Sequence, residues 1–331
     1  MDGLTIFKRV FPFAILSLVL ISGCNNQKEY HTKPVKQPPS TRKEVVQEHK
    51  TFLTREKSAP TITVWVHGTR AASRILFPNF FRSIAGLHHA SVYNAKNNLF
   101  NVANYLNSSD PDQFPYEDIY MFGWSGKLSA TTRKQSAEKL YEELLELVDE
   151  YTGRYGVAPK VRIITHSHGG NVAMYLAEAR KEHPVQLNID ELILLACPVQ
   201  KRTMHLLKDP IFTQIYSFYS KQDVIQVLDP QGVYEIKEVW NGTKKRRSKT
   251  PFFSQRRFPA QDNLEQVQVK LTGWRIIHPH LQFILEKFIR SLPKILNDLR
   301  NGKADMLAQK FQNRIKVVEF KDNPELPIEL I

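Results

Sequence analysis

The sequence predicts an α/β fold in which a mostly parallel central sheet carries helices on both faces. Six short apolar segments have the length and composition of buried strands, and longer segments with apolar residues every three or four positions lie between or after them. Strands that alternate with helices form a parallel sheet, because each crossover helix packs on a sheet face. In such sheets the functional groups gather at the carboxyl ends of the strands.

The individual elements follow from local patterns. Strands are predicted at residues 62–66, 119–122, 161–164, 192–196, 215–219 and 267–271. A helical stripe consists of Ala137, Leu140, Leu144, Val148 and Tyr151. A second helix is expected after Ser167, and a third covers residues 284–292, where Pro293 should kink or restart it. A short helix at 304–311 and a strand at 315–320 are expected near the carboxyl terminus.

The domain organisation follows from composition along the 331 residues. With 42% hydrophobic and 24% charged residues the chain can bury a full core, which excludes wholesale disorder and a collagen-like repeat. We expect a signal peptide at 1–23, a flexible tether at 24–58, a folded domain at 59–300 and a carboxyl-terminal extension at 301–331.

The amino-terminal segment predicts a membrane tether. Lys8 and Arg9 precede an apolar run at 10–21, which is too short to span a bilayer comfortably and suits a signal-peptide core. The run ends in Ile-Ser-Gly-Cys24, which resembles the lipobox of bacterial lipoproteins. That resemblance implies an acylated Cys24 and a cell-envelope location, and Asn25 resembles the outer-membrane sorting pattern if the envelope is Gram-negative. The alternative is an uncleaved membrane anchor with an incidental cysteine.

The net charge indicates the kind of partner, and the cysteine content excludes two ways of stabilising the fold. The excess of 46 Lys and Arg over 33 Asp and Glu gives a net charge of +13, which suits nucleic acid, an anionic membrane surface or an acidic polymer. No nucleic-acid-binding motif accompanies the charge, so we expect no nucleic-acid partner. Cys24 and Cys197 are the two cysteines, which excludes a disulfide framework and a cysteine-rich zinc site.

One segment carries the clearest chemical signal. The apolar strand at 161–164 runs through Thr165 and His166 into a tight turn with Ser167 at its tip, and an apolar helical pattern follows. Gly169 and Gly170 permit the strained turn and close packing of that helix, although Thr165 stands where a glycine is usual. The segment resembles the nucleophile elbow of α/β-hydrolase lipases, some of which carry Thr-His-Ser-x-Gly-Gly. The predicted fold class is therefore the α/β-hydrolase fold.

The resemblance implies a triad in the chain order serine, acid, histidine, each in a loop after a strand. A serine hydroxyl needs a histidine to remove its proton and a carboxylate to orient that histidine. Asp223 follows the strand at 215–219, with Asp229 in reserve. His278 and His280 compete as the base, and Pro279 slightly favours His278, because proline suits the first helical position.

A second segment also resembles the family. The strand at 62–66 ends in His67-Gly68-Thr69, which resembles the oxyanion loop. The resemblance implies that the backbone N–H groups of Thr69 and His168 form the oxyanion hole. It implies no cofactor and no metal, and it implies carboxylic ester hydrolysis, with a lipid or acyl ester as substrate. A thioesterase, amidase or peptidase would use the same triad.

Two alternatives stay open. Thr165-His166-Ser167-His168 also resembles the start of the metallo-β-lactamase motif, and His278 with His280 would add imidazole ligands. That motif requires Asp and His where this chain has Gly170 and Asn171. The second alternative is a noncatalytic envelope lipoprotein that keeps the fold for binding.

A second serine, a tryptophan and a basic insertion also lie near the expected site in the predicted topology. Ser125 follows a strand but lacks the second glycine of an elbow, and Trp124 lines the site or packs beneath it. The insertion at 230–263 contains a basic run at 244–249, followed by Arg256 and Arg257. We expect either a solvated loop or a rim that meets an anionic surface.

Overall fold

The computed structural model describes residues 59–69, 83–94, 97–227, 254–271, 278–302 and 315–320. Residues from Ala59 to Ile331 form a compact unit that is separate from Met1–Ser58. The expected signal peptide, the tether, Cys24, Asp229, the basic run at 244–249 and the helix at 304–311 lie outside the described residues.

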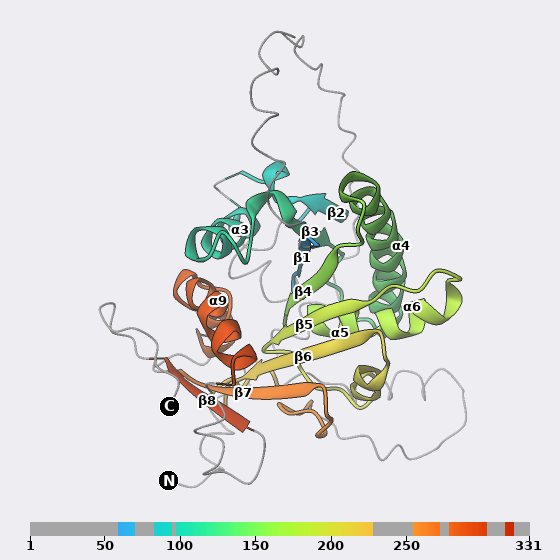
Figure 1. Cartoon of the computed structure of the whole chain (residues 1–331). Coiled ribbons are helices and arrows are strands. Elements are labelled where there is room, and N and C mark those ends of the chain that lie inside the picture. The colour runs from blue at the N-terminus through green and yellow to red at the C-terminus, as the bar shows by residue number, and fades with distance from the viewer. Residues whose placement is uncertain are drawn as a thin grey trace, which may run out of the picture. The chain divides into compact units, whose positions relative to one another are not determined.

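A sheet of eight strands forms the centre of the described unit, in the order β2-β3-β1-β4-β5-β6-β7-β8 (Figure 1). The strands are β1 (Thr61–Val66), β2 (Gly86–His89), β3 (Ile119–Gly123), β4 (Lys160–His166), β5 (Ile189–Leu195), β6 (Phe212–Tyr219), β7 (Leu264–Leu271) and β8 (Ile315–Phe320). β2 pairs antiparallel with β3, and every other neighbouring pair is parallel. The prediction of an α/β fold with a mostly parallel sheet is confirmed.

Helices cover both faces of this sheet (Figure 1). The helices are α3 (Asn98–Ser109), α4 (Ala130–Tyr155), α5 (Gly169–Met174), α6 (Leu176–Glu182), α8 (His278–Gln282) and α9 (Glu286–Arg300), with 3₁₀ turns η1 (Ala90–Val92), η2 (Tyr116–Asp118) and η3 (Met204–Lys208). One apolar core joins the sheet to α4, α5 and α6, and a second joins its other face to α3 and α9. Side chains alternate between these cores along each central strand, since successive strand residues point to opposite faces.

The structure departs from the sequence predictions in three places. α9 continues through Pro293, where a kink or restart was expected, because its buried stripe holds it against the sheet. Burial of side chains such as Phe288, Leu292 and Leu296 outweighs the one backbone hydrogen bond that a proline removes. The edge strand β2 and helix α3 were not predicted, although Leu99, Val102, Ala103 and Leu106 recur along α3 at helical spacing. The strand predicted at 315–320 is present as β8, which pairs with β7 at the edge of the sheet.

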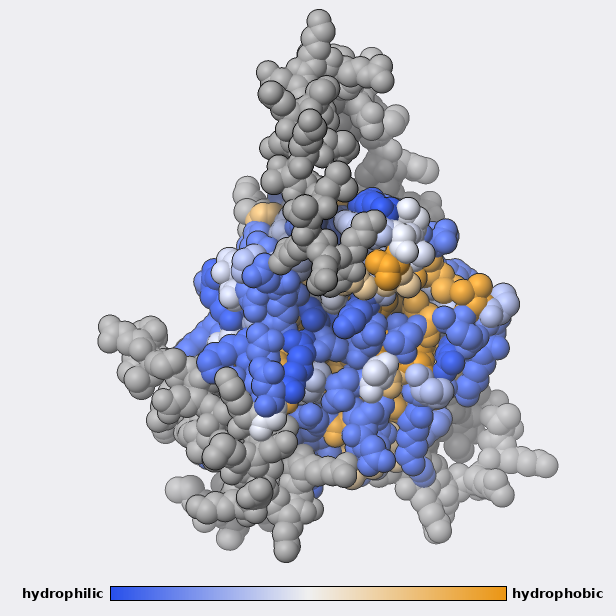
Figure 2. All heavy atoms as spheres, viewed as in Figure 1, coloured by the Kyte–Doolittle hydropathy of each residue, from blue (hydrophilic) through white to orange (hydrophobic). Residues whose placement is uncertain are grey.

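The surface of the described unit is largely polar. Figure 2 shows a mainly hydrophilic face, with hydrophobic residues gathered in small areas toward its upper right. The large hydrophobic side chains that are exposed among the described residues are Ile84, Val92, Val157 and Val185. Within the described ranges, no helix combines the length and apolar character that a membrane crossing requires.

Candidate active site

Ser167 lies at the tip of a sharp turn between β4 and α5. Its φ of 54° places it in the left-handed region, which a residue with a side chain adopts at a cost of about 1–2 kcal/mol. Two backbone hydrogen bonds hold the turn: Ser167 N donates to Leu195 O at 2.8 Å, and Gly170 N donates to Ser167 O at 3.0 Å. The serine therefore occupies the strained strand-to-helix turn expected of a nucleophile elbow.

The two glycines after this turn are required by close packing. A Cβ atom at Gly169 would lie 2.4 Å from Val66 O and 2.7 Å from His67 O. A Cβ atom at Gly170 would lie 2.5 Å from Cys197 Sγ. The start of α5 thus fits against the ends of β1 and β5 only without side chains at these positions.

Asp223 and His280 form a buried acid–base pair. His280 Nδ1 lies 2.7 Å from Asp223 Oδ2, the aspartate is fully buried and the histidine side chain is 8% exposed. Because the carboxylate accepts, His280 Nδ1 carries the proton and Nε2 is left as the basic atom. The sequence slightly favoured His278, but the residue that contacts Asp223 is His280; the His278 side chain lies outside the described part.

Further contacts fix the acid in place. Gln226 N donates to Asp223 Oδ1 at 3.0 Å. The Arg256 guanidinium donates from Nε and Nη2 to the Asp223 main-chain carbonyl, at 3.2 and 2.9 Å. Arg256, for which contact with an anionic surface stays a prediction, supports the loop that carries Asp223.

His166 connects the elbow to His280. Its Nε2 lies 3.0 Å from the His280 carbonyl oxygen, which only accepts, so Nε2 carries a proton. The two imidazole rings lie 4.8 Å apart, centroid to centroid. Burial lowers the pKa of His166 well below its usual value, and the nearby His280 and His67 lower that pKa further. His166 therefore stays neutral and holds the main chain of His280.

The loop after β1 lies directly against the serine. A Cβ atom built on Gly68 would lie 2.9 Å from Ser167 Cβ. His67 Nδ1 donates to Gly68 O at 2.7 Å, so this carbonyl faces the His67 ring. In a trans peptide the next N–H points the opposite way, and the Thr69 N–H therefore points away from that ring.

His67 is itself held on both sides. Its Nε2 accepts from Ser83 Oγ at 2.9 Å and from Trp124 N at 3.3 Å, while Trp124 Nε1 donates to His67 O at 2.8 Å. The indole stacks on the imidazole at 5.8 Å and is 4% exposed. Of the two roles considered for Trp124, the structure supports packing.

His168, the residue after the serine, has a separate set of contacts. Its Nδ1 accepts from Arg133 Nη1 at 2.6 Å. Arg133 Nη2 also donates to Gln200 Oε1 at 3.2 Å. Because arginine stays protonated, His168 Nδ1 must be an acceptor, and the ring is neutral with its proton on Nε2.

The histidines do not assemble a metal site in the described ranges. No group of three or more His, Cys, Asp and Glu side chains there is arranged to hold a metal ion. His166, His168 and His280 each direct a ring nitrogen at a different partner, namely a carbonyl, a guanidinium and a carboxylate. Each of these three rings therefore already uses one nitrogen in a contact within the protein.

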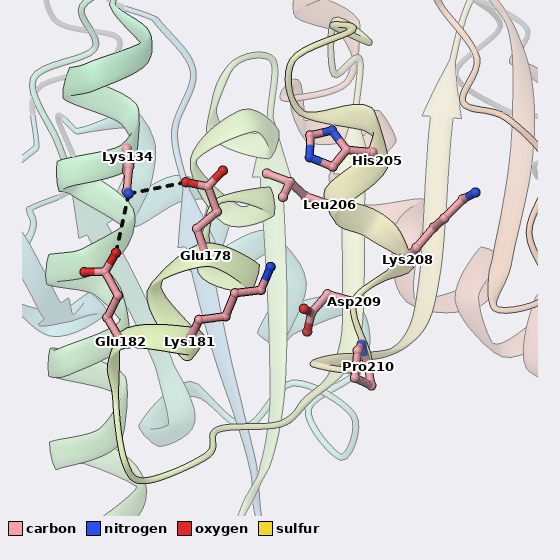
Figure 3. Close-up of a pocket in the computed structure, with 9 residues that line it drawn as sticks. All are labelled: Lys134, Glu178, Lys181, Glu182, His205, Leu206, Lys208, Asp209 and Pro210. Carbon is pink, nitrogen blue, oxygen red and sulfur yellow. Dashed lines mark hydrogen bonds and ion pairs between the residues drawn. The ribbon is translucent and has the colours of Figure 1, made fainter.

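A surface cavity of about 540 Å³ lies between α4, α6 and η3 (Figure 3). Its lining mixes charges of both signs, and Lys134 from α4 binds Glu178 and Glu182 from α6 at 3.4 and 3.5 Å. Ser167, Asp223 and His280 do not line it.

Sequence reasoning missed the supporting roles of His166, Arg133 and Gln226. Arg133 extends the predicted stripe of α4 by one turn, since it precedes Ala137 by four residues. That spacing could have identified it as a buried charge. No local pattern distinguishes His166 or Gln226.

The comparisons with known proteins give structural likeness only. No protein-family model and no curated protein matches the sequence. The structure is similar to the Pyrobaculum calidifontis esterase, with 12% identity, a TM-score of 0.36, and coverage of 92% of this chain and 94% of that one. It is similar to esterase PE8, with 11% identity, a TM-score of 0.35, and coverage of 73% and 93%. For phospholipase PlaB from Legionella pneumophila the identity is 10%, the TM-score 0.33, and the coverage 82% and 67%.

Proposed function

We propose that this chain is a serine hydrolase that cleaves carboxylic esters, with Ser167 as nucleophile, His280 as general base and Asp223 as its orienting acid. The observation that carries the proposal is the buried 2.7 Å pair of His280 and Asp223, together with a serine held at φ 54° on a strand-to-helix turn. Burying an acid with a histidine is costly, and pairs of this kind are concentrated at functional sites.

The reaction follows from these positions. His280 Nε2 takes the proton of Ser167 Oγ as this oxygen bonds to the ester carbonyl carbon, and the carbonyl electron pair moves onto its oxygen. The C–O bond to the alcohol then breaks, the alcohol leaves with the proton from His280, and an acyl-serine remains. A water molecule then attacks the acyl-serine in the same way, with His280 taking its proton, and the carboxylic acid product leaves as Ser167 regains its proton.

The negative oxygen of each tetrahedral intermediate needs hydrogen-bond donors. We assign this role to the N–H groups of Thr69 and His168. The contact of Gly68 with Ser167 and the orientation that His67 gives to the Gly68 carbonyl support the first donor. Each such donor contributes about 3 kcal/mol of transition-state stabilisation.

The finer proposal concerns substrate and location. We propose a lipid or acyl ester as substrate, and a lipid chain on Cys24 that attaches the protein to the bacterial cell envelope, in the outer membrane if the cell is Gram-negative. The apolar segment before Cys24 and the small residues next to it support the anchor. Each buried CH₂ contributes about 0.8 kcal/mol to membrane binding, so several acyl chains hold a protein firmly.

Hydrolysis of a short-chain p-nitrophenyl ester tests the activity. Ser167→Ala should abolish turnover while the melting temperature stays close to wild type, because the change opens no large cavity. Ser125→Ala is the matched control, since Ser125 is an exposed serine just after strand β3, which β1 separates from β4 in the sheet. Equal turnover in wild type and Ser167→Ala would refute the nucleophile.

A chelator separates the zinc alternative. EDTA should leave turnover unchanged; loss of activity that zinc restores would favour a metal-bound hydroxide as nucleophile. A folded wild-type protein without activity on any ester would favour the binding-module alternative.

A further inference from the structure

Arg133 is a charged side chain buried beside the residue that follows the nucleophile. It is 1% exposed and lies in the second turn of α4, whose amino terminus is capped by Ser129. Taking a guanidinium out of water costs several kcal/mol before any contact compensates. A buried charge beside a candidate active site indicates a role in the function of that site.

The contacts of Arg133 are directed at the elbow. Its guanidinium donates to His168 Nδ1 at 2.6 Å and to Gln200 Oε1 at 3.2 Å. Asn171, one helical turn after His168, extends the same polar group: its Nδ2 donates to Pro198 O at 3.0 Å and its Oδ1 accepts from Thr203 Oγ1 at 2.5 Å. Arg133 thus belongs to a buried, hydrogen-bonded polar cluster that includes the residue after Ser167.

We propose that Arg133 is a positioning residue for the oxyanion hole, and that its fixed positive charge favours the anionic tetrahedral intermediate. This inference rests on the proposed function. The His168 N–H is one of the assigned oxyanion donors, and the guanidinium contacts the side chain of that same residue. The charge acts through protein rather than through water, where screening would weaken it.

A purely structural tie would make a different prediction. If Arg133 only packed α4 against the elbow, its loss would weaken neutral and anionic ligands alike, because the whole site would shift. If its charge matters, its loss weakens ligands that carry a negative oxygen and spares neutral ligands of the same shape.

The test compares two inhibitors of the full-length chain. An alkyl trifluoromethyl ketone accepts Ser167 Oγ at its carbonyl carbon, its carbonyl electron pair becomes an oxyanion, and His280 takes the serine proton. The matching methyl ketone binds as an uncharged carbonyl. Arg133→Met should raise the inhibition constant of the trifluoromethyl ketone by about 10- to 100-fold, because a charge held in a protein interior changes the stability of a nearby anion by about this factor. It should lower kcat/KM by a similar factor, with the loss in kcat rather than in KM. The methyl ketone constant should change less than about 3-fold.

Three further variants complete the comparison. Arg133→Lys keeps the charge and should recover most of the trifluoromethyl ketone affinity. Arg133→Gln keeps a hydrogen-bond donor without the charge and should behave like Arg133→Met. The glutamine variant also replaces the methionine variant if the latter fails to fold. Lys134→Met removes a charge from the adjacent, solvent-facing position on α4, where it binds Glu178 and Glu182 (Figure 3), and should leave both constants unchanged.

The outcomes separate this inference from the proposed function. Equal losses for both ketones in the Arg133 variants, or no loss for either, would overturn the role of Arg133 while wild-type ester hydrolysis still stood. A wild-type protein that neither hydrolyses esters nor binds the trifluoromethyl ketone would overturn the proposed function itself, and the role of Arg133 with it.

Discussion

Gly169→Ala places a methyl group where the backbone of β1 passes the elbow. The new Cβ would lie 2.4 Å from Val66 O and 2.7 Å from His67 O, whereas ordinary contacts begin near 3.4 Å. One of the two segments must therefore move by about 1 Å. Since the obstacles are main-chain atoms, no rotamer change relieves the clash, and we expect the upper end of the overpacking cost, about 3 kcal/mol.

The same displacement should reduce activity. The residues after Val66 are His67 and Gly68, and Gly68 lies against Ser167, so a shift there moves the proposed oxyanion donor of Thr69. A misplacement of about 1 Å can cost about 100-fold in rate. Urea unfolding measures the stability of the variant, and hydrolysis of a short-chain ester measures its kcat.

Two comparisons isolate the cause. Gly153→Ala lies in α4 with open space around its Cβ, and should raise stability by about 0.5–1 kcal/mol through helix propensity. Gly170→Ala meets the Cys197 side chain, with its Cβ 2.5 Å from Sγ, so adding Cys197→Ala should recover part of the lost stability. A Gly169→Ala protein within about 0.5 kcal/mol of wild type, with unchanged kcat, would refute this reasoning.

Three further predictions follow from individual contacts. Asp223→Asn should lower kcat by about 10⁴-fold while the protein stays folded, because an amide no longer holds His280 with its proton on Nδ1; steady-state kinetics and a thermal melt check this. His166→Phe keeps an aromatic ring but leaves the buried His280 carbonyl without this donor, so we expect a loss of about 1–2 kcal/mol in urea unfolding and a lower kcat, whereas unchanged kinetics would contradict the positioning of His280. Burial raises the pKa of Glu191, but Arg162 and Arg300 lower this pKa more, so the ionised carboxylate stabilises the fold above the pKa of the unfolded chain. Glu191→Gln should therefore lower the free energy of unfolding by about 2 kcal/mol at pH 7 and by progressively less as the pH falls below about 4. A loss of stability that stays the same at pH 3 would count against the ion pairs.

The parts of the fold that the sequence predicted are those with strong local periodicity. The central strands are buried on both faces and so appear as short apolar runs, as in Ile62 to Val66, and the elbow appears because Ser167 is followed by two glycines. β2 has four residues at the edge of the sheet, and packing against β3 rather than its own composition makes it a strand. Pro293 was expected to interrupt a helix because a local rule cannot weigh the buried face of α9.

The site itself depends on contacts between distant segments. His278 and His280 both lie in α8, and only the position of that helix relative to the loop of Asp223 decides which one the acid meets. Arg133 shares the spacing of the buried stripe of α4, but only the tertiary structure shows that its guanidinium contacts His168. Sequence spacing can nominate such residues, whereas their partners follow from tertiary packing.

The most direct test of the central assignment is the site of covalent labelling by a fluorophosphonate, located by mass spectrometry of the tryptic peptides. The native chain should carry one adduct, on Ser167, because a phosphonylating reagent reacts with a serine activated by His280 and Asp223. Labelling should be lost in Ser167→Ala and after heat denaturation, and should persist in Ser125→Ala. A native, folded protein that remains unlabelled, or that carries its adduct on another residue, would contradict the assignment of Ser167 as the nucleophile.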